Sequence, residues 1–117
     1  VPCTLPKCTV VKVQLVLYQN RETGDPATYW LGLVHVGLGN ERTVTKGKWG
    51  IRQGVNEYSA GIVYKLDSNT DEEFQYYWRA SNSILFILDD NFNPKVGNAA
   101  WSYTLNRYDA PYGPRTY

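Results

Sequence analysis

The two cysteines are the residues with the clearest capacity for chemistry. Cys3 and Cys8 lie in the opening stretch "VPCTLPKC" with four residues between them, and His35 is the only histidine of a chain that has no methionine. The pair has three states open to it: a disulfide, two free thiols, or two ligands of a soft metal such as copper(I). A tetrahedral zinc site needs two further ligands, which the spacing of the carboxylates does not supply. We favour the disulfide and keep Cys3 and Cys8 as candidate copper ligands.

No other residues combine into a catalytic set. None of the serines lies in a Gly-x-Ser-x-Gly context, and a single histidine would have to serve any triad. His35 stands between Val34 and Val36, which favours a structural imidazole over a metal ligand. The acidic stretches "TDEE" (70–73) and "LDD" (88–90) lack the spacing of a calcium loop. The sequence therefore predicts no enzymatic activity.

Aromatic residues are unusually frequent, with ten Tyr, four Trp and three Phe. In "FQYYWRA" (74–80), period-two alternation places Phe74, Tyr76 and Trp78 on one face and Tyr77 on the other. Such residues either fill the core of a small barrel or line a cavity for one amphipathic ligand. Packing is the favoured interpretation, because a short chain needs its interior. The candidate cavity residues are Trp30, Phe74, Tyr76, Trp78, Trp101 and Tyr103.

The elements that must position these residues are strands. In "TVVKVQLVLY" (9–18), apolar residues recur at every second position, from Val11 to Leu17, and no ten-residue segment carries a helical stripe. Similar stretches separated by turns cover 28–36, 43–52, 58–67, 74–80, 84–89 and 99–108. Seven or eight short strands predict an all-β, small antiparallel up-and-down β-barrel with little helix. We expect one domain over 1–108 and an irregular C-terminal tail over 109–117.

The charge balance argues against two classes of partner. Twelve Lys and Arg face eleven Asp and Glu, for a net charge of +1, and no stretch of the sequence clusters Lys and Arg on one face. We therefore expect no nucleic-acid partner and no polybasic membrane anchor. No run of about eighteen apolar residues predicts a membrane span, and Val1 does not open a charged-then-apolar leader.

Several of these stretches together resemble the N-terminal domain of the NlpE family, the copper-resistance-associated envelope lipoproteins of Gram-negative bacteria. "VPCTLPKC" is similar to the family's cysteine-containing opening, although the family's two cysteines stand two residues apart. "KGKWGI" (46–51) is similar to its Gly-x-Trp element, and "ILFILDDNFNPKVGNAAWSYTLNR" (84–107) to its closing segment. The resemblance implies a lipocalin-like barrel that is exported and tethered to the outer membrane by a lipidated cysteine upstream of Val1.

The resemblance also implies a function. We expect a non-catalytic envelope domain, facing the periplasm or the surface, that binds an envelope protein partner in stress sensing or copper resistance. An oxidising periplasm would favour the disulfide. Two alternatives remain open: a lipocalin-like carrier of a small amphipathic or lipid ligand, and copper(I) binding by Cys3 and Cys8. No cofactor other than this copper is expected.

Overall fold

The computed structural model consists of antiparallel strands and describes residues 1–3, 5–55, 58–67, 74–98, 102–108 and 114–117. The strands are β1 (Val10–Gln19), β2 (Pro26–Val36), β3 (Arg42–Val55), β4 (Tyr58–Asp67), β5 (Tyr76–Ser81), β6 (Ile84–Leu88), β7 (Thr104–Asn106) and β8 (Arg115–Thr116). No helix that could cross a membrane occurs among the described residues. The all-β fold predicted from the sequence is confirmed.

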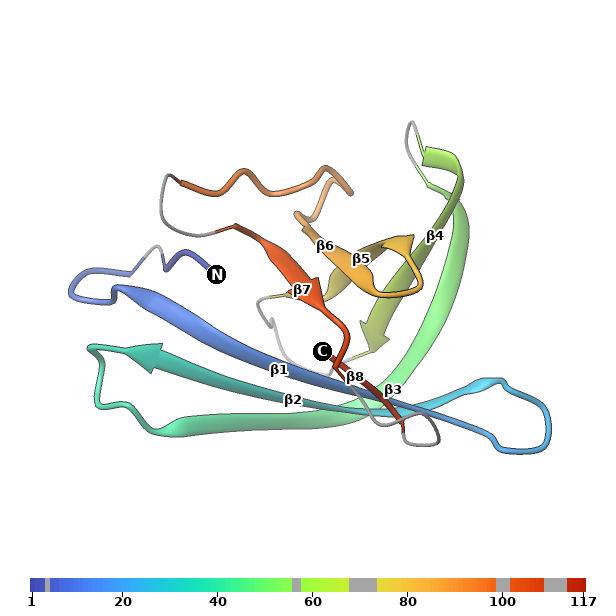
Figure 1. Cartoon of the computed structure of the whole chain (residues 1–117), viewed down its shortest axis with the longest axis horizontal. Coiled ribbons are helices and arrows are strands. Elements are labelled where there is room, and N and C mark those ends of the chain that lie inside the picture. The colour runs from blue at the N-terminus through green and yellow to red at the C-terminus, as the bar shows by residue number, and fades with distance from the viewer. Residues whose placement is uncertain (4, 56–57, 68–73, 99–101, 109–113) are drawn as a thin grey trace.

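The eight strands of the described residues belong to one curled sheet with the order β7-β6-β5-β4-β3-β2-β1-β8. Strands β1 to β7 follow one another as an up-and-down meander, and only β8 returns across the sheet to pair with β1. Figure 1 shows β1, β2 and the first part of β3 as one layer and β5 to β7 as the other, with the long β3 curving between them. The sheet is therefore a half-barrel whose concave inner face encloses the core.

Period-two alternation determines which side chains enter this core. Val11, Leu15 and Leu17 of β1 are buried on the inner face, while the intervening residues point to the convex outer face. Strands β2 to β7 contribute in the same way, and the inner-face residues form a continuous hydrophobic cluster. Its members from β2 to β7 include Tyr29, Leu31, Leu33, Trp49, Tyr64, Leu66, Tyr77, Leu85, Ile87 and Leu105.

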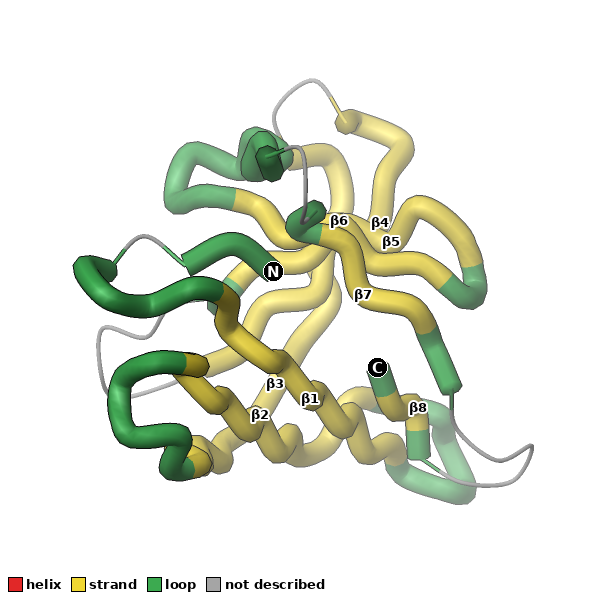
Figure 2. The backbone as a smooth tube through the Cα atoms, turned by 60° about the vertical axis from the view of Figure 1, so that its left-hand side comes forward, coloured by secondary structure: helices red, strands yellow, loops and turns green. Residues whose placement is uncertain are grey.

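Both ends of the chain pair with the same edge of β1. Val1 and Val11 exchange two backbone hydrogen bonds, of 3.0 and 2.9 Å, at the beginning of the strand. Leu15 and Tyr117 exchange two more, of 3.1 and 2.8 Å, further along it. Figure 2 shows the N-terminus beside β1 and the C-terminus beside β8. The two chain ends thus protect much of an edge that would otherwise be free to pair with another strand.

The boundaries differ from the prediction at two places. Phe74, predicted to begin a strand, adopts a left-handed backbone conformation with φ of 63°, and β5 begins at Tyr76. The C-terminal tail predicted as irregular includes β8, whose Arg115 pairs with Leu17. Residues 109–113 of that tail lie outside the described residues. A two-residue strand has no periodicity to read, so only its partner β1 reveals it.

Candidate functional site

The two cysteines form a disulfide between Cys3 and Cys8, with their Cα atoms 5.8 Å apart. The loop that the bridge closes leads from Val1, paired with β1, back into β1 itself. A disulfide leaves no thiolate for a metal, so copper(I) binding stays a prediction for the reduced protein only. No group of three or more His, Cys, Asp or Glu that could hold a metal occurs within the described part of the chain.

The sheet separates the aromatic residues that were predicted to line one cavity. Phe74 is buried in the inner core, and Tyr103 packs against that core. The ammonium group of Lys95 lies 5.1 Å from the centre of the Phe74 ring and 5.3 Å from that of Tyr103. These two rings therefore pack with a cation and with the core.

Tyr76 and Trp78 lie on the opposite, outer face of β5. The ring of Tyr76 packs edge-on against Phe92, and that of Trp78 lies 5.4 Å from Phe86. The alternation predicted for this strand is present, but its fully buried member is Tyr77. Trp101 lies outside the described residues.

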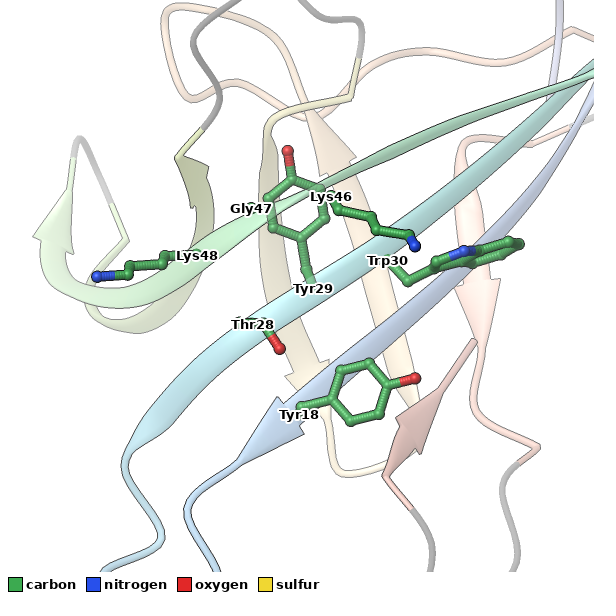
Figure 3. A pocket seen from close by; sticks show the side chains of 7 residues that line it. All are labelled: Tyr18, Thr28, Tyr29, Trp30, Lys46, Gly47 and Lys48. Atoms are coloured by element: carbon green, nitrogen blue, oxygen red, sulfur yellow. The ribbon is translucent and has the colours of Figure 1, made fainter.

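The sixth predicted residue, Trp30, lines a groove on the outer face of β1, β2 and β3. This groove, here called the outer groove, has a volume of about 550 Å³. Its lining residues are Tyr18, Thr28, Tyr29, Trp30, Lys46, Gly47 and Lys48. In Figure 3 the rings of Tyr18 and Trp30 lie on the same side of the sheet as Thr28, whereas the ring of Tyr29 points to the other side.

The register of the strands brings these residues together. Trp30 pairs with Val16 of β1 and with Lys46 of β3, and Thr28 pairs with Lys48. Tyr18 lies opposite a bulge in β2, because Leu17 pairs with Tyr29 and Gln19 with Pro26, which leaves two residues of β2 opposite one of β1. Side chains directly opposite each other on one face of a sheet are about 5 Å apart at Cβ. The small Thr28 therefore leaves a depression beside the larger side chains.

Gly32 determines how the ring of Trp30 lies. A Cβ atom on Gly32 would be 2.6 and 2.8 Å from two carbons of the six-membered ring of Trp30, so the indole lies directly over the glycine. The guanidinium carbon of Arg42 lies 5.7 Å from the Trp30 ring. The ring thus rests on the sheet in contact with Gly32, between a cation on one side and the groove on the other.

A second glycine shapes the inner side of the same region. A Cβ on Gly47 would be 2.9 Å from the ring of Tyr29 and 2.6 Å from the carbonyl oxygen of Asp67. The fully buried ring of Tyr29 therefore packs across Gly47 on the core side. Below the bulge, the indole N–H of Trp49 donates a hydrogen bond of 2.8 Å to the carbonyl oxygen of Tyr18. Contacts inside the core therefore hold the backbone of the outer groove in place at Gly47 and at Tyr18.

The outer face of β1 to β3 is positively charged. These strands contain five Lys or Arg, one in β1 and four in β3, and neither Asp nor Glu. Lys12, Arg42, Lys46 and Lys48 all alternate with inner-face residues and are exposed. The nearest acid in the register is Asp67, the partner of Lys48, and its carboxylate lies 3.5 Å from the ammonium of Lys65. The sequence-based view that Lys and Arg do not gather on one face is therefore wrong for these strands.

Sequence reasoning missed Tyr18, Thr28, Lys46 and Lys48 as site residues. The available signal was the stretch "TVTKGKWG" (43–50), in which Lys46 and Lys48 are two residues apart and so point to the same face of a strand. Finding the rest requires the cross-strand register, which depends on residues distant in the sequence.

No family model, curated protein or solved structure matches the chain. Its function is therefore inferred from the chemistry of the outer groove and of the strands around it.

Proposed function

We propose that this domain is a non-catalytic binding module and that the outer groove holds its ligand. The observation that carries the proposal is the pair of aromatic rings, Tyr18 and Trp30, standing on the outer face beside the small Thr28. The side chain of Tyr18 is 43% exposed, although a tyrosine ring gains free energy when its apolar face is covered. A volume of about 550 Å³ lies within the range of small-molecule sites. The ligand is a small amphipathic molecule with a flat or ring-shaped part.

The chemical groups of the outer groove support binding rather than catalysis. Its described lining offers the rings of Tyr18 and Trp30, two ammonium groups and the hydroxyls of Thr28 and Tyr18. A nucleophile needs an adjacent base, and the lining includes no imidazole, carboxylate or thiol. Stacking, hydrogen bonding and ionic contact are the interactions that this set of groups provides.

The position of the ligand differs from that in a lipocalin-like carrier. Such carriers hold the ligand inside the barrel, whereas here large side chains such as Tyr29, Tyr64 and Tyr77 occupy the inner face. A ligand that stacks on Trp30 approaches the outer face. The carrier function expected as an alternative from the sequence is thus proposed in a changed form, with the site outside the barrel.

We propose the Gram-negative envelope as the setting of this module, in line with its resemblance to the NlpE N-terminal domain. The Cys3–Cys8 disulfide supports this, because disulfides persist in oxidising compartments and are rare in the cytosol. The test is to fractionate the source cells and alkylate the protein before reduction. Recovery with the envelope and without alkylated cysteines is expected. Recovery in the cytosol with two alkylated cysteines would contradict the envelope assignment.

The binding proposal is tested with the amphipathic dye anilinonaphthalene sulfonate, which has fused rings and one anionic group. We expect its fluorescence to increase with the wild type and with Val96→Ala, a control for an exposed apolar residue outside the groove. The Tyr18→Ala, Trp30→Ala double variant should lose most of the increase while keeping a cooperative urea transition. An equal increase with the double variant would exclude the outer groove as the binding site.

A further inference from the structure

We infer that the ligand of the outer groove is an acidic saccharide, whose sugar ring stacks on Trp30 and whose carboxylate or sulfate contacts Lys46. This inference rests on the proposed function and specifies the chemical class of the ligand. Three features of the described residues carry it: the charge of the strands, the extension of their cations beyond the groove, and the pairing of the β2 backbone on both sides.

The first feature is charge complementarity. Lys46 is the cross-strand partner of Trp30, and in Figure 3 its side chain extends toward the indole, whereas that of Lys48 extends away from it. Arg42 lies on the other side of the same ring, at 5.7 Å. With no Asp or Glu in β1, β2 or β3 to neutralise them, these cations attract an anion.

The second feature is that the cations extend along the strands beyond the groove. Lys12 and Arg42 flank Val34, four residues along β2 from Trp30, which corresponds to about 13 Å. A single small anion would contact only one end of this surface. A short chain of rings that repeats its negative charge can contact Lys46 and Arg42 beside Trp30 at one end and Lys12 at the other.

The third feature distinguishes a saccharide from a single-stranded nucleic acid, which also combines rings with negative charge. Strand β2 pairs with β1 on one side and with β3 on the other, so its backbone groups are occupied and cannot read the edge of a base. The isoelectric point of about 7.9 is also below the values typical of nucleic-acid-binding domains. The disulfide further favours a compartment outside the cytosol, where acidic glycans occur.

The stacking contact that the groove offers has little directional requirement, which suits a sugar. The apolar face of a sugar ring stacks on an indole without a directed hydrogen bond, and its hydroxyls can reach Thr28 and the hydroxyl of Tyr18. The ring of Trp30 is held in place by Gly32 and Arg42 before any ligand arrives. Pre-organisation of this kind lowers the entropic cost of binding.

The test is calorimetric titration of the 117-residue protein with tetragalacturonic acid and with its fully methyl-esterified, uncharged counterpart. We expect the acid to bind and its affinity to fall with added salt. The Lys46→Gln, Lys48→Gln double variant should bind on the order of tenfold more weakly. Arg21→Gln, which changes an exposed cation in the β1–β2 turn, should bind as the wild type does.

Four results would overturn the inference, and each contradicts a different part of it: the role of charge, the site, or the class of ligand. Equal binding of the acid and the ester would remove the role of charge but keep the groove as a ring-binding site. Binding of the acid that is insensitive to Trp30→Ala would place the site elsewhere and contradict the proposed function as well. Tighter binding of a single-stranded oligothymidylate than of the acid would identify a nucleic acid as the polyanion. No binding of the acid, with the dye still bound in the groove, would reject the saccharide alone.

Discussion

The indole N–H of Trp49, in the core, donates a hydrogen bond of 2.8 Å to the backbone carbonyl oxygen of Tyr18, which lies in β1 opposite the bulge of β2. The bond joins residues of β1 and β3, between which β2 lies in the sheet. Because Tyr18 forms one wall of the outer groove, the core and the proposed binding surface share this contact. The ring of Trp49 also packs edge-on against Tyr64, with ring centres 5.1 Å apart.

Trp49→Phe should destabilise the domain by about 2 kcal/mol, because it leaves the Tyr18 carbonyl without its donor and the core with a small void. Trp30→Phe, on the outer face, is the matched control and should cost less than about 1 kcal/mol. Urea unfolding followed by circular dichroism measures both. Equal destabilisation by the two substitutions would show that the Trp49 contact does not hold the bulge.

Gly32→Ala should displace the indole of Trp30, because the added Cβ would be 2.6 Å from its ring. The ring is the far end of a side chain on the surface, so the loss of stability should stay near 1 kcal/mol while dye binding in the outer groove falls. Gly50→Ala is the matched control, since a Cβ there has no neighbour within 4 Å. If Gly32→Ala binds the dye as Gly50→Ala does, the ring position does not matter for binding.

Removal of the disulfide by Cys3→Ser and Cys8→Ser should lower the free energy of unfolding by about 2 kcal/mol, the loop-entropy value for so short a loop. Hydrogen exchange provides an internal control on the same edge of β1. The amide of Val11, bonded to Val1, should exchange faster, whereas that of Leu15, bonded to Tyr117, should stay protected. Unchanged exchange at Val11 would mean that the N-terminal pairing does not depend on the bridge.

Tyr117 should make the domain less stable at high pH. Burial raises the pKa of its hydroxyl above the ordinary 10.0, and the charge of the nearby Arg115 only partly offsets this effect. The free energy of unfolding is at its full value, as far as Tyr117 is concerned, below pH 10.0. It falls as the pH rises through the folded pKa, because the hydroxyl ionises first in the unfolded chain.

The measurement is the urea midpoint at pH about 8 and about 11, compared with Tyr117→Phe. The variant should lose less stability between the two values than the wild type. Tyr108→Phe, at a side chain that is 62% exposed, should behave like the wild type. A variant at position 117 with the same alkaline loss as the wild type would contradict the assignment.

The strands and the core were predictable because period two is a local property. The alternation from Val11 to Leu17 identifies the inner face of β1 without knowledge of its neighbours. The aromatic strand β5 shows the limit of such reading. Alternation there separates Tyr76 from Tyr77 correctly but does not say which of the two faces the core.

The outer groove could not be predicted in the same way, because its lining comes from three strands. Thr28 and Lys48 meet only through the register of β2 and β3, and Tyr18 joins them only through a bulge. The role of Gly32 depends on the direction in which the indole of Trp30 leans, which the sequence does not state. The disulfide between Cys3 and Cys8 was the favoured interpretation, because the sequence lacks the further ligands of a tetrahedral metal site and an oxidising compartment was expected.

The most direct test of the central claim, that the outer groove is the binding surface, is an NMR titration of the tryptophan indole N–H signals with tetragalacturonic acid. Trp30→Phe and Trp78→Phe assign the two signals that decide the outcome. We predict that the Trp30 signal shifts progressively and saturates, while the signal of Trp78, on β5 and outside the lining of the groove, stays where it is. A Trp30 signal that does not move while the saccharide binds would show that the saccharide binds outside the outer groove.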